Sequence, residues 1–266
     1  MRSDPLKKSA FETKELSNKG NTFIVSESEE ISEVKKIIDE FCPGPSEIPY
    51  LPDKYFPALK IFSDNPDCFV RSTVAALLVN FETEESKQIL IRLAQDKENI
   101  VRYEAYDSLS IFNEDEEVQL FFEKSIPKER DEFARFYAIT SWADITVSKE
   151  DVSEDIRFIR RVRKVQKTDW GKLACWYALY LLGEESGFKK FLKFLQSRDW
   201  KIRLNTLYLL KNPIRFQDFS EKQLITIRRK LKELLKQEPK QEPFAQVRKV
   251  AEELIHFIDT GEEIDS

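Results

Sequence analysis

A series of regularly spaced basic residues is the first candidate for chemistry in this sequence. Successive members are separated by 31, 33, 37, 31 and 45 residues: Arg71, Arg102, Arg135, Lys172, Arg203 and Arg248. Guanidinium groups bind carboxylates and phosphates through planar pairs of hydrogen bonds. The arginines could therefore clamp an anionic ligand, but their regular spacing favours a structural role in which each ties one repeat to the next.

The remaining reactive side chains form no recognisable active site. The only histidine, His256, is near the C-terminal end, and no serine or cysteine nucleophile is close to it in the sequence. Phosphate-binding glycine loops and the His-Glu-x-x-His motif are missing, and the chain has only 6 glycines. We therefore predict no catalytic residue, no cofactor and no metal ion.

Two acidic runs, at residues 27–30 and 114–117, are candidates for holding a divalent cation. Neither has the spacing of a calcium-binding loop. Both are at expected helix starts, where carboxylates accept hydrogen bonds from free N–H groups and interact favourably with the helix dipole. A capping role is therefore favoured over a metal site.

Basic side chains gather on one expected helix in the second half of the chain. Residues 156–216 carry fifteen basic and four acidic side chains, whereas residues 82–132 carry seven basic and fifteen acidic ones. Four of the basic residues share one helix face: Arg157, Arg160, Arg161 and Lys164. This face could contact phosphates, although a solvent-exposed helix face is the simpler interpretation.

The composition is that of a soluble chain with a large surface. Apolar residues make up 41%, charged residues 34%, and the net charge is −5. No apolar run is long enough to span a membrane, and the first 20 residues do not resemble a secretory signal. The cysteines, Cys42, Cys68 and Cys175, have no metal-binding or disulfide pattern. We expect a cytoplasmic protein.

Pairs of amphipathic helices must position these side chains. Apolar residues three and four positions apart predict a short helix near residues 55–62 and longer ones at 28–41, 65–80, 83–94, 99–112, 115–126, 131–145, 148–165, 169–182, 184–196, 199–211, 219–237 and 244–259. The residue three after each member of the basic series is small or modest: Val74, Ala105, Ala138, Cys175, Thr206 and Ala251. Such residues allow neighbouring helices to pack closely.

The layout Asp, hydrophobic, Val, Arg, then Ala and Leu at helical spacing resembles the HEAT repeat family. Its best copies are Asp67 to Leu78, Asp96 to Leu109 and Asp199 to Leu210. The resemblance implies an all-α fold, an α-solenoid of HEAT-like helix pairs in a right-handed superhelical array. We expect an N-terminal extension with one helix at residues 1–51, the repeat array at 52–260 and an acidic tail at 261–266.

In this repeat class the second helix of each pair lines the concave side, so aromatic residues there predict a binding surface. If Asp107 faces outward, its equivalents in the next repeats are Thr140, Tyr177 and Tyr208. Tyrosine and tryptophan are enriched at protein interfaces, although some could fill the core between repeats. We predict a partner-binding groove along Tyr103, Tyr106, Asp107, Phe136, Trp176, Tyr177, Tyr180 and Tyr208.

These features predict a non-enzymatic module that binds another protein. A sharper hypothesis is an inhibitor or immunity protein that neutralises a basic toxin or nuclease, attracted by the acidic residues 82–132. The alternative is a nucleic-acid-binding protein, similar to HEAT-like DNA glycosylases, that uses residues 156–216. An enzyme within the first 65 residues is the least favoured hypothesis.

Overall fold

A computed structural model describes residues 29–40, 48–113, 115–216, 219–237, 239 and 244–262. Within these ranges the regular structure consists of α-helices and short 3-10 helices, without strands. The predicted all-α class is therefore confirmed. In the same ranges, no helix has both the length and the apolar character needed to cross a membrane. Most of the expected N-terminal extension, Cys42 and residues 263–266 of the expected tail lie outside the described ranges.

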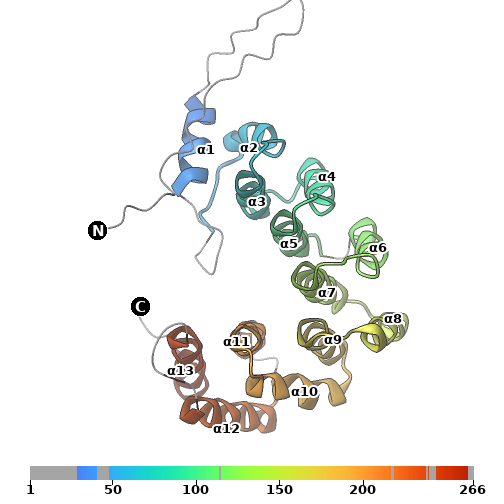
Figure 1. Cartoon of the computed structure of the whole chain (residues 1–266), viewed down its shortest axis with the longest axis vertical. Coiled ribbons are helices and arrows are strands. Elements are labelled where there is room, and N and C mark those ends of the chain that lie inside the picture. Colours follow the sequence, from blue (N-terminus) through green and yellow to red (C-terminus); the bar gives the residue numbers. More distant parts are fainter. Residues whose placement is uncertain are drawn as a thin grey trace, which may run out of the picture.

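The helices form two rows along an arc (Figure 1). The inner row contains α3 (Cys68–Leu77), α5 (Asn99–Ser108), α7 (Glu132–Thr146), α9 (Asp169–Leu181) and α11 (Trp200–Arg215). The outer row contains α2 (Phe56–Phe62), α4 (Glu84–Leu93), α6 (Glu116–Ser125), α8 (Ser153–Val165), α10 (Glu185–Phe191) and α12 (Glu221–Gln237). α1 (Glu29–Glu40) packs on α2 at one end, and α13 (Ala245–Thr260) packs on α11 and α12 at the other. The concave side of the solenoid is therefore formed by the inner row.

Several helices begin at the capping residues that the sequence indicates. The side chain of Asp67 accepts a hydrogen bond from the N–H of Phe69 at 2.9 Å, and that of Asp131 accepts one from Ala134 at 2.8 Å. Asp115 accepts one from Val118 at 3.1 Å. The capping role predicted for the acidic run at residues 114–117 is therefore confirmed at Asp115, whereas Glu114 lies outside the described residues.

The rows approach closely because the residues at their contacts are small. The six residues predicted to allow close packing are all fully buried: Val74, Ala105, Ala138, Cys175, Thr206 and Ala251. Between the rows, the larger side chains of Trp142, Phe122 and Leu90 are also fully buried. Each helix pair therefore buries its apolar face against the next pair, as in other repeat arrays.

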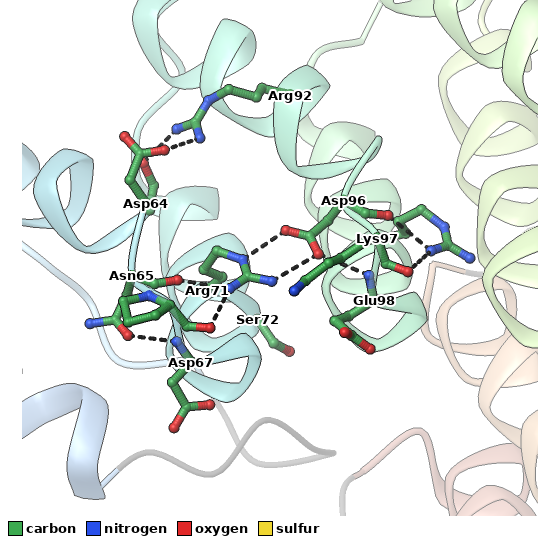
Figure 2. Close-up of polar contacts among 12 residues, drawn as sticks. Asp64, Asn65, Asp67, Arg71, Ser72, Arg92, Asp96, Lys97 and Glu98 are labelled. Carbon is green, nitrogen blue, oxygen red and sulfur yellow. Dashed lines mark hydrogen bonds and ion pairs between the residues drawn. The ribbon is translucent and has the colours of Figure 1, made fainter.

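Two arginines of the basic series join successive repeats. Figure 2 shows Arg71, whose Nε and Nη2 donate hydrogen bonds to the carboxylate of Asp96 at 2.7 and 2.9 Å. Its Nη1 donates to the carbonyl oxygens of Asn65 and Pro66. Arg102 repeats this arrangement with Glu129, at 2.8 and 2.9 Å. The structural role predicted for these arginines is therefore confirmed.

The third junction departs from this pattern because it has no carboxylate at the matching position. Gln166 stands six residues before Lys172, as Asp96 and Glu129 stand six before Arg102 and Arg135. Arg135 donates from Nη1 to the carbonyl oxygen of Glu129 at 3.1 Å. The buried Nε of Arg135 and the buried Oε1 of Gln166 have no hydrogen-bond partner within the described residues. Within the described residues, this junction therefore lacks the two-bond ion pair of the first two.

Candidate binding groove

The concave side holds a groove built from four inner helices. A pocket of about 530 Å³ is lined by residues of α5, α7, α9 and α11, among them five of the predicted groove residues: Tyr103, Asp107, Phe136, Tyr177 and Tyr208. An adjoining pocket of about 640 Å³ shares Asp144, Tyr177 and Asn212 with the first and extends the groove to Tyr180. The ring of Tyr180 stacks on Phe219 with the centroids 5.5 Å apart.

Helical spacing explains which residues reach the groove. Asp107, Thr140, Tyr177 and Tyr208 occupy equivalent positions on successive inner helices, and all four line the first pocket. The side chains one helical turn before and after them lie on the same face. They add lining residues that the sequence analysis missed: Glu104, Tyr137, Asp144, Asn205, Lys211 and Asn212. Phe133, two turns before Thr140, and Leu209 line the pocket as well. Extending the Asp107 register by one turn in each direction would have found most of them.

Two of the predicted groove residues, Tyr106 and Trp176, point away from the groove. Tyr106 is only 2% exposed and packs against Phe121 and Phe122, away from the concave pocket. Trp176 lies under the guanidinium group of Arg163, which is 4.4 Å from the ring centroid. Each residue immediately precedes a groove residue, and consecutive side chains on a helix point about 100° apart. Tyr106 and Trp176 therefore contact the outer row rather than the groove.

The groove concentrates carboxylates whose environment disfavours their charge. Burial raises the pKa of Glu104 to about 8, and the nearby carboxylate of Asp107 raises it further in the same direction. Loss of hydration also raises the pKa of Asp107 to about 6 and that of Asp144 to about 7. Both aspartates keep contact with solvent, but the walls of the groove displace much of the surrounding water. The hydroxyl of Tyr177 donates a hydrogen bond to Asp144 at 3.3 Å.

An aromatic cluster forms the wall beside these carboxylates. The rings of Tyr103 and Tyr137 stack with centroids 5.3 Å apart and an interplanar angle of 25°. Phe133 meets Tyr103 edge-on at 5.0 Å and contacts Trp170 at 4.9 Å. These contacts fix the orientation of the wall, because aromatic rings at such distances attract one another in preferred geometries.

Comparison with known protein families matches residues 57–142 to HEAT repeats. The chain contains HEAT repeats. The matched HEAT segment includes most of α2 and all of α3 through α6, and it ends within α7, so it covers the helices that carry Tyr103, Asp107 and Phe136. HEAT repeats are in general protein-interaction modules and are typically non-catalytic. No curated protein matches the chain.

The basic residues predicted as possible phosphate ligands lie on the outer row of the helical array. Arg157 pairs with Glu154 on its own helix, and Arg160 donates a hydrogen bond to Glu184 at 2.9 Å. Arg161 and Lys164 are exposed on α8. α9 separates α8 from the concave side (Figure 1), so this basic face and the groove are different surfaces.

Potential metal ligands do not gather in the part of the helical array that the structure describes. Across the residues that the structure describes, no group of three or more histidine, cysteine, aspartate or glutamate side chains is placed to hold a metal ion. His256 lies on α13, and Cys175 is buried on α9. Burial raises the pKa of the Cys175 thiol to about 12, which leaves it in the unreactive, protonated form at neutral pH.

Proposed function

We propose that this chain is a non-enzymatic module that binds a partner protein in its concave groove. One observation supports this above all: aromatic and carboxylate side chains from four successive inner helices line one open groove. Aromatic residues provide much of the binding energy at protein interfaces, and charged residues select the partner. The general role of HEAT repeats in protein interaction agrees with this proposal.

We further propose that the partner is basic, as expected for an inhibitor or immunity protein that neutralises a toxin or nuclease. The support is electrostatic. Residues 82–132 have a net charge of −8, and α5, which carries Glu104 and Asp107, belongs to this acidic section. Opposite charge on a partner would accelerate its association with this surface, and that acceleration would weaken with salt.

Site-specific photo-crosslinking in the native source would test the position of the interface. A photoreactive amino acid at Leu209, in the lining of the groove, should capture one defined protein. The matched control is the same amino acid at Leu120, which is 52% exposed on the outer helix α6. Capture from Leu120 but not from Leu209 would contradict a partner in the groove. A captured protein with a negative net charge would contradict only the proposal that the partner is basic.

Nucleic-acid binding through α8 is the second candidate function. Its support is the exposure of Arg161 and Lys164, neither of which forms an ion pair within the described part of the chain. An electrophoretic shift assay with DNA and RNA at several salt concentrations would test it, because phosphate contacts weaken steeply with salt. Replacing Arg161 and Lys164 by glutamate should abolish any shift, whereas the same change at Lys124 and Lys128 should not. No shift at low salt would exclude this candidate.

A further inference from the structure

The carboxylates of the groove differ from several other carboxylates of the array in having no paired cation in the described part of the chain. Asp96, Glu129 and Asp155 each have a basic partner, with nitrogen-to-oxygen distances of 2.7, 2.8 and 3.0 Å. Glu104, Asp107 and Asp144 have no such ion pair within the described residues, although Lys211 also lines the pocket. Glu104 is partly buried, whereas Asp107 and Asp144 are exposed to the solvent of the groove. The charge of Asp107 is close enough to disfavour the charges of Glu104 and Asp144, so the three carboxylates repel one another at a cost in free energy. A cation supplied from outside would remove this cost.

The aromatic wall indicates which cation fits. The stacked rings of Tyr103 and Tyr137 belong to the same pocket as the carboxylates, and the rings of Tyr177 and Tyr208 line it as well. A guanidinium group can stack on aromatic faces while its N–H groups donate to carboxylates in its own plane. An ammonium group is a more strongly hydrated point charge and cannot stack in this way.

The size of the groove indicates how such a cation would be presented. The pocket of about 530 Å³ is larger than one side chain needs, and it continues into the second pocket through Asp144, Tyr177 and Asn212. An arginine on an extended segment could place its guanidinium group among the carboxylates while its neighbours in the segment follow the groove.

We propose that the groove recognises an arginine side chain on a basic segment of the partner, held between the Tyr103–Tyr137 wall and the carboxylates of Glu104, Asp107 and Asp144. This inference rests on the proposed function, and it specifies which side chain of the partner the groove binds. Basic segments without arginine, and nucleic acids, are alternative ligands that the test separates.

Fluorescence polarisation with short labelled peptides tests this proposal on the full chain. The probe peptide carries two arginines between glycines and serines, and its matched controls carry citrulline or lysine instead. Citrulline keeps the shape of arginine without its charge, so it should bind at least about tenfold more weakly. Lysine should bind several-fold more weakly than arginine. A DNA oligonucleotide should not displace the arginine peptide.

Variants of the chain locate the binding. Asp107→Asn and Asp144→Asn should each weaken binding of the arginine peptide at least about tenfold, because each keeps the shape of the side chain but removes its charge. The control is Glu116→Gln with Glu123→Gln on the outer helix α6, which should bind as the parent does.

Specific results would overturn the proposal. Equal binding of the arginine and citrulline peptides, or unchanged binding by both groove variants, would refute recognition of a cation. Equal binding of arginine and lysine would refute the assignment to arginine. If any of these results is obtained and Leu209 still crosslinks to a natural partner, the groove remains an interface. Only the recognition of arginine is then rejected.

Discussion

The guanidinium group of Arg102 holds the carboxylate of Glu129 in a two-bond ion pair across a repeat junction, although the two residues are 27 positions apart. The same carboxylate accepts a hydrogen bond from the N–H of Asp131 at 2.9 Å, just before α7 begins. One side chain thus connects α5 to the start of α7. Arg71 and Asp96 make the equivalent connection between α3 and the turn before α5.

Removing this carboxylate should destabilise the array strongly. Glu129→Ala leaves the largely buried guanidinium group of Arg102 without its carboxylate partner, which we expect to lower the free energy of unfolding by about 3 kcal/mol. Urea unfolding followed by circular dichroism measures this. Glu154→Ala, which removes the exposed pair with Arg157, should change it by less than about 0.5 kcal/mol. Equal effects of the two substitutions would contradict a connecting role for Glu129.

Lys87 holds three acidic residues together in the outer row. Its Nζ is 2.7 Å from Glu84, 2.9 Å from Asp115 and 3.0 Å from Glu117, and these hydrogen bonds raise the pKa of Lys87 despite its burial. Lys87→Met would leave three like charges close together.

We expect Lys87→Met to lower the free energy of unfolding by about 1–3 kcal/mol. Added salt should recover part of this loss, because screening weakens repulsion between exposed charges. Urea titrations at 0.05 M and 1 M salt measure both effects, and Lys124→Met on α6 is the control. A loss that does not change with salt would argue against repulsion as its cause.

Gly187 permits the close approach of α10 to α9. A Cβ atom at this position would lie 2.7 Å from the backbone nitrogen of Tyr180 and 2.9 Å from the carbonyl oxygen of Trp176. Backbone atoms of a packed helix cannot yield as a side chain can, so Gly187→Ala should cost about 1–3 kcal/mol. Thermal unfolding measures this, with the exposed Ser186→Ala as control. An unchanged midpoint would show that α10 moves away without cost.

The groove carboxylates should make the chain less stable as the pH rises. Their raised pKa values mean that the folded chain retains protons at pH values where the unfolded chain has lost them. Their contribution to stability therefore falls from about pH 4 to about pH 8. Tyr103, Tyr137, Tyr177, Tyr208 and Lys211 are the other titratable groups that line the first pocket.

Replacing the groove aspartates by asparagine should remove part of this loss of stability at high pH. We expect Asp107→Asn with Asp144→Asn to raise the unfolding midpoint at pH 8 by at least about 2 °C and to leave it nearly unchanged at pH 4. Differential scanning calorimetry across this range measures both midpoints. A variant that is less stable than the parent at pH 8 would show that these carboxylates stabilise the groove.

The sequence alone determined the helices and their pairing, because both depend on local spacing. Apolar residues three and four positions apart placed nearly all of the helices, and Asp67, Thr83, Asp115, Asp131 and Asp199 begin helices where capping chemistry predicts. One end was wrong. The helix expected to stop at residue 211 continues through the buried Pro213 to Arg215, since packing in the array overrides the local preference of proline.

Only the tertiary structure decided which side chains meet in the groove. Asp107 and Asp144 belong to different repeats, and nothing in their local sequences shows that both line one pocket or that their charge is disfavoured there. Tyr106 and Asp107 are neighbours in the sequence, yet one is in the core and the other in the groove. A pKa depends on the water and charge around a group, and the stacking of one repeat on the next sets both.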